Sequence, residues 1–458
     1  MDNFQEFMRQ VANVRPSARQ MDWFDTEFYA FVHFSPNTYT GLEWGTGQED
    51  PAIFNPTELD CDQWVRAIKA AGMRGMVLTA KHHDGFCLWP SRYTDHCIKN
   101  SPYKNGRGDI VREAAEACRR GGIKFGFYLS PWDRNSPLYG TDAYNDYYKA
   151  QLTELLTQYG EIFYVWFDGA CGEGPNGRRQ EYDFPGYIEL IRKYQPRAFV
   201  FNDAGPDVRW CGNESGSARF AEWAVVPGEL CPMAEVQTGP GPLAGDLSYM
   251  YNTDANIGSL SNILYSRGLC FCGSEVDMSI RPGWFYHPEE QPHSLERLMQ
   301  TYLTSVGGNA CFHLNIPPMP NGKFDERDVR RLEELGQALR AAFGRRLGAD
   351  ASIERTAASA GETQCAFTMT LTHPEQARYL ELKEDIAQSG QRVESFLVQL
   401  QDGFGQWNTV SQGSTIGHKR IVCLSQGGLP EPGITVRRLR IVITAARDRV
   451  ERLSIRLY

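Results

Sequence analysis

Short apolar segments rich in aromatic and β-branched residues recur along the chain, and this pattern predicts buried strands. The clearest is FYVWFDGA at residues 163–170, which is apolar on both faces and ends in Asp168 and Gly169. A buried strand with polar residues at its end also occurs three times earlier: FYAFVHF with His33, MVLTAKHHDGF with His82 and His83, and IKFGFYLSPWD with Tyr128. Where such strands close into a barrel, their C-terminal ends carry the chemistry. These polar side chains are therefore predicted to share one rim.

Helical segments separate the predicted strands. TELDCDQWVRAIKAAGM, which starts at Thr57, has apolar residues at helical spacing and stops at Gly72. The segment that starts at Arg107 has Asp109 as its predicted N-cap, and a third helix is predicted from Tyr144. Alternation of strand and helix with a repeat of about 30–45 residues predicts parallel strands, because a parallel return needs a crossover connection.

Later strand-like segments extend the series toward eight strands. They are RAFVFND at 197–203, LYSRGLCFCGSEVDMS at 264–279 and GGNACFHLNIPP at 307–318. We predict an α/β fold with a (β/α)₈-like TIM barrel over residues 1–345, closed by a helix from Asp325 to about Phe343. The helices after Asp203 look short or missing.

The pattern changes in residues 346–458. Short segments in which apolar and polar residues alternate, such as AFTMTLTH and GITVRRLRIVIT, are separated by glycine-containing turns. This pattern predicts a C-terminal antiparallel β-sandwich. Its predicted role is to pack against the barrel, and sugar binding is the alternative.

Composition excludes several classes of protein. The 458 residues carry a net charge of -9 without a basic stripe, so nucleic acid is not an expected partner. The N-terminal MDNFQEFMRQ has no apolar core of a signal peptide, and no run of about 18 apolar residues occurs. We expect no membrane span and a cytoplasmic location. The twelve cysteines include no CxxC pair, which favours reduced thiols over disulfides or a zinc site.

A second candidate carboxylate, Glu214, lies in VRWCGNESGSARFAEW. The glycine, asparagine and serine residues of this segment predict a loop at the barrel mouth, after the fifth strand. Trp210 and Trp223 flank it, and partial desolvation by indole rings would raise the pKa of Glu214 and favour proton donation. Paired with Asp168, it would give the two carboxyl groups of a retaining glycosidase. The alternative is a solvated surface glutamate.

Each of these residues also has a purely structural interpretation. Asp168 could cap the next helix, and His33 could be a satisfied core histidine. His82 and His83 could be a cap and a supporting hydrogen-bonding group, whereas Glu43 could pair with an arginine. Their joint occurrence at strand ends favours a functional site.

Six separated motifs together resemble the α-L-fucosidases of glycoside hydrolase family 29. In chain order they are FVHFSPNTYTGLEWGTG, LTAKHHDGFCLWPS, GDIVREAAEACRRGGIKFGFYLSPWDR, FYVWFDGA, SIRPGWFYH and GGNACFHLNIPP. The resemblance runs from about Trp23 to Leu339. SPWDRN and RWCGNESG resemble the branch of the family that is selective for α-1,3- and α-1,4-linked fucose.

The resemblance implies a role for each matching residue. It makes Asp168 the nucleophile and Glu214 the acid/base. The residues that it places around the fucose ring are His33, Glu43, Trp44, His82, His83 and Tyr128, with Arg281 and Trp284 bordering the same pocket. Imidazoles and a carboxylate suit vicinal hydroxyl groups, and an indole face suits the C6 methyl group of fucose. The chain departs from the family pattern at Ser35, Cys311 and His313, none of which is a presumed catalytic group.

We therefore expect an exo-acting, retaining α-L-fucosidase that acts on α-1,3/1,4-fucosylated oligosaccharides, without a cofactor or a metal ion. A fucosidase of broad linkage specificity is the first alternative. A metal-dependent barrel hydrolase using His33, His82, His83 and Asp168 is the second. The third is a non-catalytic sugar-binding barrel.

Overall fold

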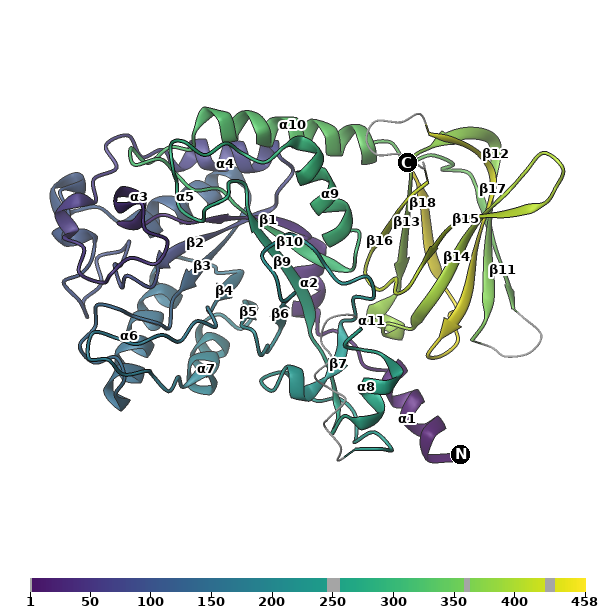
Figure 1. The fold of residues 1–458 in the computed structure, drawn as a ribbon, viewed down its shortest axis with the longest axis horizontal. Helices are drawn as coiled ribbons and strands as arrows, with labels where there is room; N and C mark the ends of the chain where they lie inside the picture. Colours follow the sequence, from purple (N-terminus) through teal and green to yellow (C-terminus); the bar gives the residue numbers. More distant parts are fainter. Residues whose placement is uncertain (1, 245–255, 358–362, 425–432) are drawn as a thin grey trace.

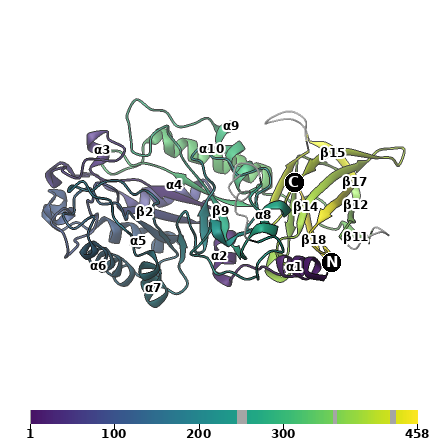
Figure 2. The ribbon, with the colours of Figure 1, turned by 60° about the horizontal axis from the view of Figure 1, so that its bottom comes forward.

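The computed structural model describes residues 2–244, 256–357, 363–424 and 433–458, and it contains a barrel and a β-sandwich side by side (Figure 1; Figure 2). Eight parallel strands close the barrel in the order β1-β10-β9-β6-β5-β4-β3-β2. Their bounds are β1 Phe28–Val32, β2 Gly75–Lys81, β3 Lys124–Leu129, β4 Tyr164–Trp166, β5 Phe199–Phe201, β6 Val208–Trp210, β9 Gly273–Ser279 and β10 Ala310–Asn315. The predicted fold class is confirmed.

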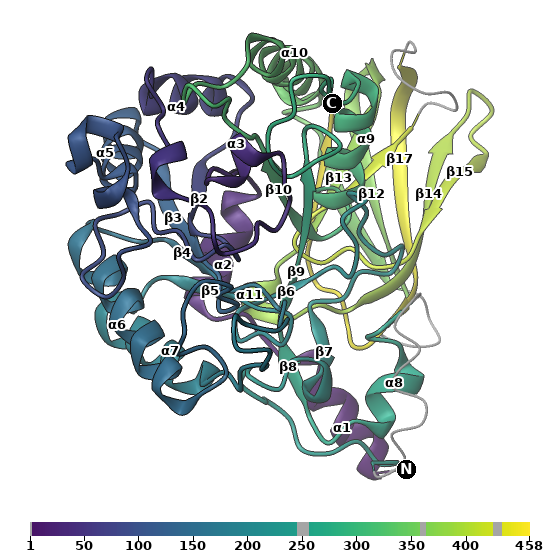
Figure 3. The ribbon, with the colours of Figure 1, turned by 60° about the vertical axis from the view of Figure 1, so that its left-hand side comes forward.

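Helices surround the barrel and connect its strands (Figure 3). They are α2 Ala18–Thr26, α3 Asn37–Thr40, α4 Cys61–Ala70, α5 Ile110–Gly121, α6 Asp142–Gln158, α7 Phe184–Tyr194, α9 Leu295–Ser305 and α10 Glu326–Phe343, with α1 Asp2–Ala12 preceding them. The predicted cap at Asp109 is confirmed, because its side chain accepts a hydrogen bond from Arg112 N. Gly122 ends α5 at φ 68°, a conformation that favours glycine. The long α10 runs along the barrel toward the sandwich (Figure 1).

The prediction was wrong about how the barrel is completed. Its sixth strand, β6, consists of the three residues VRW, which the sequence placed in a loop, so Glu214 follows the sixth strand and not the fifth. The segment 264–279 contains two strands. The first, β8 (Leu269–Phe271), pairs outside the barrel with β7 (Val225–Pro227), and only the second, β9, joins the barrel. Three-residue strands are too short for periodicity to reveal.

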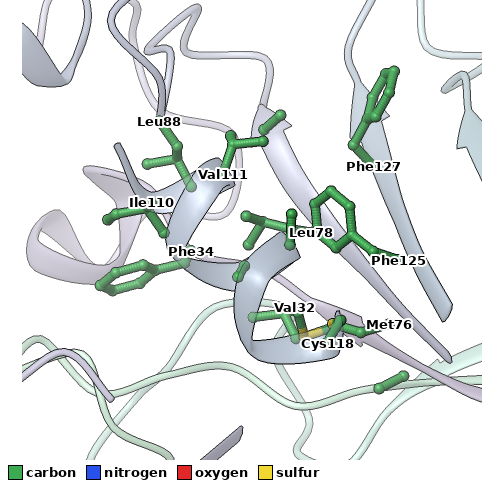
Figure 4. Close-up of a cluster of buried hydrophobic side chains, with 14 of the residues drawn as sticks. Val32, Phe34, Met76, Leu78, Leu88, Ile110, Val111, Cys118, Phe125 and Phe127 are labelled. Carbon is green, nitrogen blue, oxygen red and sulfur yellow. The ribbon is translucent and has the colours of Figure 1, made fainter. Parts of the chain in front are cut away.

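The core between the first three strands and α5 is mainly apolar. Figure 4 shows Ile110 and Val111 of α5 packed among Val32, Leu78 and Phe125, which come from the first three strands. All five side chains are at most 5% exposed. Burying a side chain of this kind contributes about 1.5–3 kcal/mol, so this helix fixes the strands whose ends carry the predicted site.

The C-terminal region forms the predicted antiparallel sandwich. One sheet has the order β11-β12-β17-β14-β15 and the other β16-β13-β18. The strands are β11 Ser352–Ala357, β12 Cys365–Ala377, β13 Tyr379–Glu384, β14 Val393–Gln401, β15 Trp407–Gly413, β16 Arg420–Cys423, β17 Ile434–Ala446 and β18 Leu453–Leu457, and the short α11 Ile386–Ser389 follows β13. Buried and half-buried residues alternate along the first part of β12, as expected for a strand with one face in the core.

Within the part of the chain that the structure describes, no helix combines the length and the apolar composition needed to cross a bilayer. No disulfide bond joins the cysteines of the described residues.

Asn309 joins the barrel to the sandwich. Its Nδ2 donates to the Glu222 carbonyl at 3.0 Å, and its Oδ1 accepts a hydrogen bond from the His418 backbone N at 2.7 Å. It is 2% exposed and has φ 67°, which asparagine tolerates better than most residues. One side chain therefore satisfies buried backbone groups of both domains.

We expect Asn309→Ala to destabilise the protein by about 2–4 kcal/mol, because the buried His418 N loses its partner, the Glu222 carbonyl keeps only Gln391 Nε2, and alanine tolerates φ 67° less well than asparagine. The measurement is the thermal unfolding midpoint compared with wild type. Asn408→Ala is the matched control, since Asn408 is exposed on β15, and it should change stability by about 0.5 kcal/mol or less. Equal midpoints for the two variants would contradict this role.

Candidate active site

A pocket opens at the C-terminal ends of the barrel strands, and every predicted site residue except Arg281 lines it. The lining residues are Phe31, His33, Glu43, Trp44, His82, His83, Tyr128, Trp166, Asp168, Glu214, Asp277 and Trp284. They come from β1, β3, β4 and β9 and from the loops that follow β1, β2, β4, β6 and β9. This is the end of a parallel barrel at which active sites form.

Asp168 is held as an acceptor at the end of β4. Tyr128 Oη donates to Oδ2 at 3.0 Å and Ala170 N donates to Oδ1 at 2.7 Å. The side chain is 25% exposed and faces the pocket. The N-cap of the next helix, α7, is Asp183, so Asp168 is not a helix cap. These two donors fix the orientation of the carboxyl group at the end of β4.

Gly169 fits this turn because Asp203 presses against it. A Cβ atom at position 169 would lie 2.0 Å from Asp203 Oδ2, so only glycine fits without a shift of Asp203. The close approach of Asp203 therefore explains why a glycine follows Asp168.

The three pocket histidines are buried and neutral. Burial lowers the pKa of His33 to about 3 and that of His82 well below its ordinary value. Burial also lowers the pKa of His83, although the charge of Asp168 opposes this. Neutral imidazoles can both donate to and accept from sugar hydroxyl groups.

Hydrogen-bond partners fix the tautomers of two of these rings. His33 Nδ1 lies 2.8 Å from Asn315 Oδ1, which can only accept, so Nδ1 carries the proton. His83 Nδ1 lies 2.7 Å from Ser130 Oγ, whose own proton goes to the Trp132 carbonyl. In both rings Nε2 is therefore left as an acceptor. His83 Nε2 lies 3.7 Å from Asp168 Oδ2.

Glu43 is anchored by the loop after β9. Its Oε2 accepts a hydrogen bond from Trp284 N at 2.9 Å, and its Oε1 lies 3.0 Å from His287 Nε2. The alternative of an arginine partner is wrong, because the partner is a histidine. The sequence analysis missed His287, although it lies at the end of the quoted motif SIRPGWFYH.

Glu214 lies on the exposed loop after β6, and its surroundings differ from those predicted. Trp284 Nε1 donates to its Oε2 at 3.2 Å. Of the two indoles that flank it in sequence, Trp210 donates to Asp277 and Trp223 lies buried under the guanidinium of Arg447. The predicted desolvation by these two rings is therefore wrong, because Glu214 is exposed and its indole partner comes from a distant segment.

Arg281 is structural, contrary to its predicted position at the pocket. It is 1% exposed, and its Nε donates to Asp328 Oδ2 at 2.8 Å. Asp325 at the start of α10 forms a second ion pair with it. Arg281 thus fixes the loop that carries Trp284 to the start of α10, and its charge is paired there and not in the pocket.

The barrel interior below the pocket holds an acid that the sequence analysis did not single out. Glu275 of β9 accepts hydrogen bonds from Tyr29, Tyr164 and Trp166 Nε1, and it lies 3.2 Å from His313 Nδ1. Burial alone would raise the pKa of Glu275, but His313 and the tyrosine hydroxyls bring it below its ordinary value. Two acids alternating in an otherwise buried strand, as in GSEVDMS, are the sequence signal for Glu275 and Asp277.

A larger cavity of about 620 Å³ lies at the opposite end of the barrel, beside Lys124 at the start of β3 and Phe199 at the start of β5. We place the active site in the smaller pocket because it lies at the C-terminal strand ends and contains Asp168 and Glu214. Among the described residues, no group of three His, Cys, Asp or Glu side chains is arranged to hold a metal ion.

Comparison with known proteins agrees with this geometry. The α-L-fucosidase family model matches residues 9–235 and 246–342. α-L-Fucosidase 1 of Arabidopsis thaliana is 39% identical over 433 residues, which cover 89% of this chain and 81% of the plant protein. The crystal structure of a putative α-L-fucosidase from Bacteroides ovatus is 39% identical with a TM-score of 0.86, covering 99% of this chain and 76% of that one.

A family 29 fucosidase of Ruminococcus gnavus, solved in complex with fucose, is 28% identical with a TM-score of 0.80, covering 97% of this chain and 95% of that one. The family model matches most of the chain, and the Arabidopsis relative is 39% identical over 89% of it. The chain therefore belongs to the α-L-fucosidases of glycoside hydrolase family 29.

Proposed function

We propose that this α-L-fucosidase is an exo-acting, retaining enzyme in which Asp168 is the nucleophile and Glu214 is the acid/base. The observation that carries the proposal is that these two carboxyl groups, distant in sequence, line the same pocket. Retaining glycosidases use such a pair, with the carboxyl groups about 5–5.5 Å apart when the substrate is bound.

In the first step, a carboxylate oxygen of Asp168 attacks C1 of the fucose residue. The bond from C1 to the glycosidic oxygen breaks, and the proton of Glu214 passes to that oxygen. In the second step, Glu214 takes a proton from water, and the water oxygen attacks C1. The ester bond to Asp168 breaks, and L-fucose leaves with the anomeric configuration of the substrate.

The surroundings of each acid suit its role. The hydrogen bonds from Tyr128 and Ala170 stabilise a charge on Asp168. Glu214 lies on the solvent side of the pocket, where a leaving group departs and a water molecule enters. Trp284 Nε1 orients it from across the pocket.

The size of the pocket supports exo action. Its volume is about 80 Å³. This is several times the roughly 10–15 Å³ that a cavity needs in order to hold one water molecule. That is room for a single terminal sugar residue, and the rest of the glycan then lies outside.

The product anomer tests the mechanism. We expect proton NMR to detect α-L-fucose as the first product from an α-fucoside, before mutarotation produces the β-anomer. First release of β-L-fucose would show inversion and would remove Asp168 from the role of nucleophile.

We further propose selectivity for α-1,3- and α-1,4-linked fucose on branched glycans. The support is the resemblance of SPWDRN and RWCGNESG to that branch of the family, together with an aromatic rim beside the pocket. Trp44 is 61% exposed there and meets Trp132 edge to face at 5.7 Å, and the Arg134 guanidinium lies over the Trp132 ring. An exposed indole and a cation suit the ring and hydroxyl groups of a second sugar.

This selectivity predicts higher kcat/KM on 3-fucosyllactose and Lewis-type trisaccharides than on a 2-linked or nitrophenyl fucoside, by about 10-fold or more. The reason is that contacts with the second sugar contribute binding energy in the transition state. A digestion panel with chromatography of released fucose measures it. Comparable rates on all of these substrates would reject the proposal.

A further inference from the structure

Asp277 is an acid of the pocket to which the proposed mechanism gives no role. It lies on β9, is 4% exposed and lines the pocket together with Asp168 and Glu214. It follows Glu275 by two residues and is in register with His313 of β10. Residues two apart on a strand share a face, so Glu275 and Asp277 both point into the barrel, one above the other.

The two oxygens of the Asp277 carboxyl group have different surroundings. Oδ1 accepts a hydrogen bond from Trp210 Nε1 at 2.8 Å. No other residue of the described chain donates a hydrogen bond to Oδ2, and the carboxyl group lines the pocket. No described cation forms an ion pair with either oxygen. Since Oδ1 is already an acceptor, a proton on this group belongs on Oδ2.

The charges around Asp277 favour its neutral form. Glu275 on its own strand and Glu214 on the loop after β6 act on it by their charge. His313 is its register partner on β10, and Asp168 lines the same pocket. Burial raises the pKa of Asp277 well above its ordinary value, and the charges of Glu275 and Glu214 raise it further. The hydrogen bond from Trp210 opposes this rise only in part.

We propose that Asp277 is a substrate-binding acid that works in its protonated form, with the Oδ2 hydroxyl donating a hydrogen bond to the sugar in the pocket. A carboxylic acid kept neutral by a buried site is a strong hydrogen-bond donor. The neutral form also keeps one more negative charge away from Asp168 and Glu214, both of which change charge during the proposed reaction. The inference rests on the proposed use of this pocket by the fucose residue.

Affinity for L-fucose, measured by isothermal titration calorimetry, tests the role of Asp277 without requiring turnover. Asparagine has the shape of a protonated aspartic acid and keeps an N–H donor, so Asp277→Asn is expected to bind L-fucose within about threefold of wild type. Asp277→Leu lacks the donor and is expected to bind about 10-fold more weakly. Asp203→Asn is the matched control, because Asp203 follows β5 at the same rim but does not line the pocket.

The pH dependence separates this role from a purely structural one. As the pH rises through the pKa of Asp277, wild type loses the donor and gains a charge, so its affinity falls. The affinity of Asp277→Asn should lack that fall. If Asp277→Leu does not fold, the pH dependence of wild type and Asp277→Asn still tests whether Asp277 binds the sugar in its protonated form.

Two results would overturn the inference. Equal weakening in Asp277→Asn and Asp277→Leu would show that the carboxylate is the binding form. Wild-type affinity in both variants would show that Asp277 does not contact the sugar. Failure of the retaining mechanism would instead appear in the product anomer and in the kinetics of Asp168 variants, so the two proposals fail separately.

Discussion

Asp168→Gly is expected to lower kcat by on the order of 10⁴-fold or more, because no other group can form the ester with C1. The substitution removes the carboxyl group that accepts hydrogen bonds from Tyr128 and Ala170, and it leaves a space in the pocket wall. Steady-state kinetics on an aryl α-fucoside measures the loss. A near-normal kcat would refute the role of nucleophile.

Added azide should partly restore this variant. The anion enters the space left by the carboxyl group and attacks C1 from the same side, so that a bond from C1 to nitrogen forms as the bond to the aryl oxygen breaks. The expected product is β-L-fucosyl azide, which chromatography and NMR identify. Recovery of α-fucosyl azide would indicate attack from the opposite side and would contradict the proposed geometry.

Glu173→Gln is the matched control for Asp168→Gly. Glu173 is an exposed acid on the same loop after β4, and it does not line the pocket. It should keep wild-type kcat and KM within about threefold, since surface substitutions change free energies by about 0.5 kcal/mol or less.

Glu214→Ala is expected to lower kcat/KM on a fucosylated oligosaccharide by about 10²–10⁴-fold, because the departing sugar oxygen must be protonated. On a dinitrophenyl α-fucoside the phenolate leaves without a proton, so formation of the fucosyl-enzyme should be affected far less. Pre-steady-state kinetics on both substrates separates the two effects. Equal losses on both substrates would contradict the role of proton donor.

A loss of activity in Glu214→Ala that comes from a damaged structure can be distinguished from a loss of the proton donor. The side chain is exposed on a loop, and its one described side-chain partner is the Trp284 indole, so truncation removes no core packing. Unfolding midpoints of the variant and wild type should agree. Glu235→Gln is the control, since Glu235 is an exposed acid in the same long connection between β6 and β9 and lies outside the pocket.

The pattern of residues was sufficient where an element is long and amphipathic or wholly apolar. The amphipathic helix from Ile110 and the apolar segment that contains β4 have such patterns, and both were predicted. The strand Val208–Trp210 was not, because this segment, unlike that of the equally short β4, does not lie in an apolar run. Its place in the barrel depends on pairing with β9, which is distant in the chain.

The same division applies to the pocket. The ends of the strands identified Asp168, His33 and Tyr128, because chain order places them at one rim. The surroundings of Glu214 could not be predicted, since neighbours in sequence on a loop need not be neighbours in space. Arg281 was misplaced for the same reason: its partners, Asp325 and Asp328, belong to α10.

The sequence by itself determined the barrel, the sandwich after it and the pocket side chains at the strand ends, because strand and helix periods and strand ends are local properties. Glu43, Trp44 and Trp284 came from the family resemblance. Only the tertiary structure decided which partner each polar group has: Trp284 for Glu214, His287 for Glu43 and Trp210 for Asp277. These pairs form between segments brought together by barrel closure. For Asp277, burial and the neighbouring charges that barrel closure brings close raise the pKa.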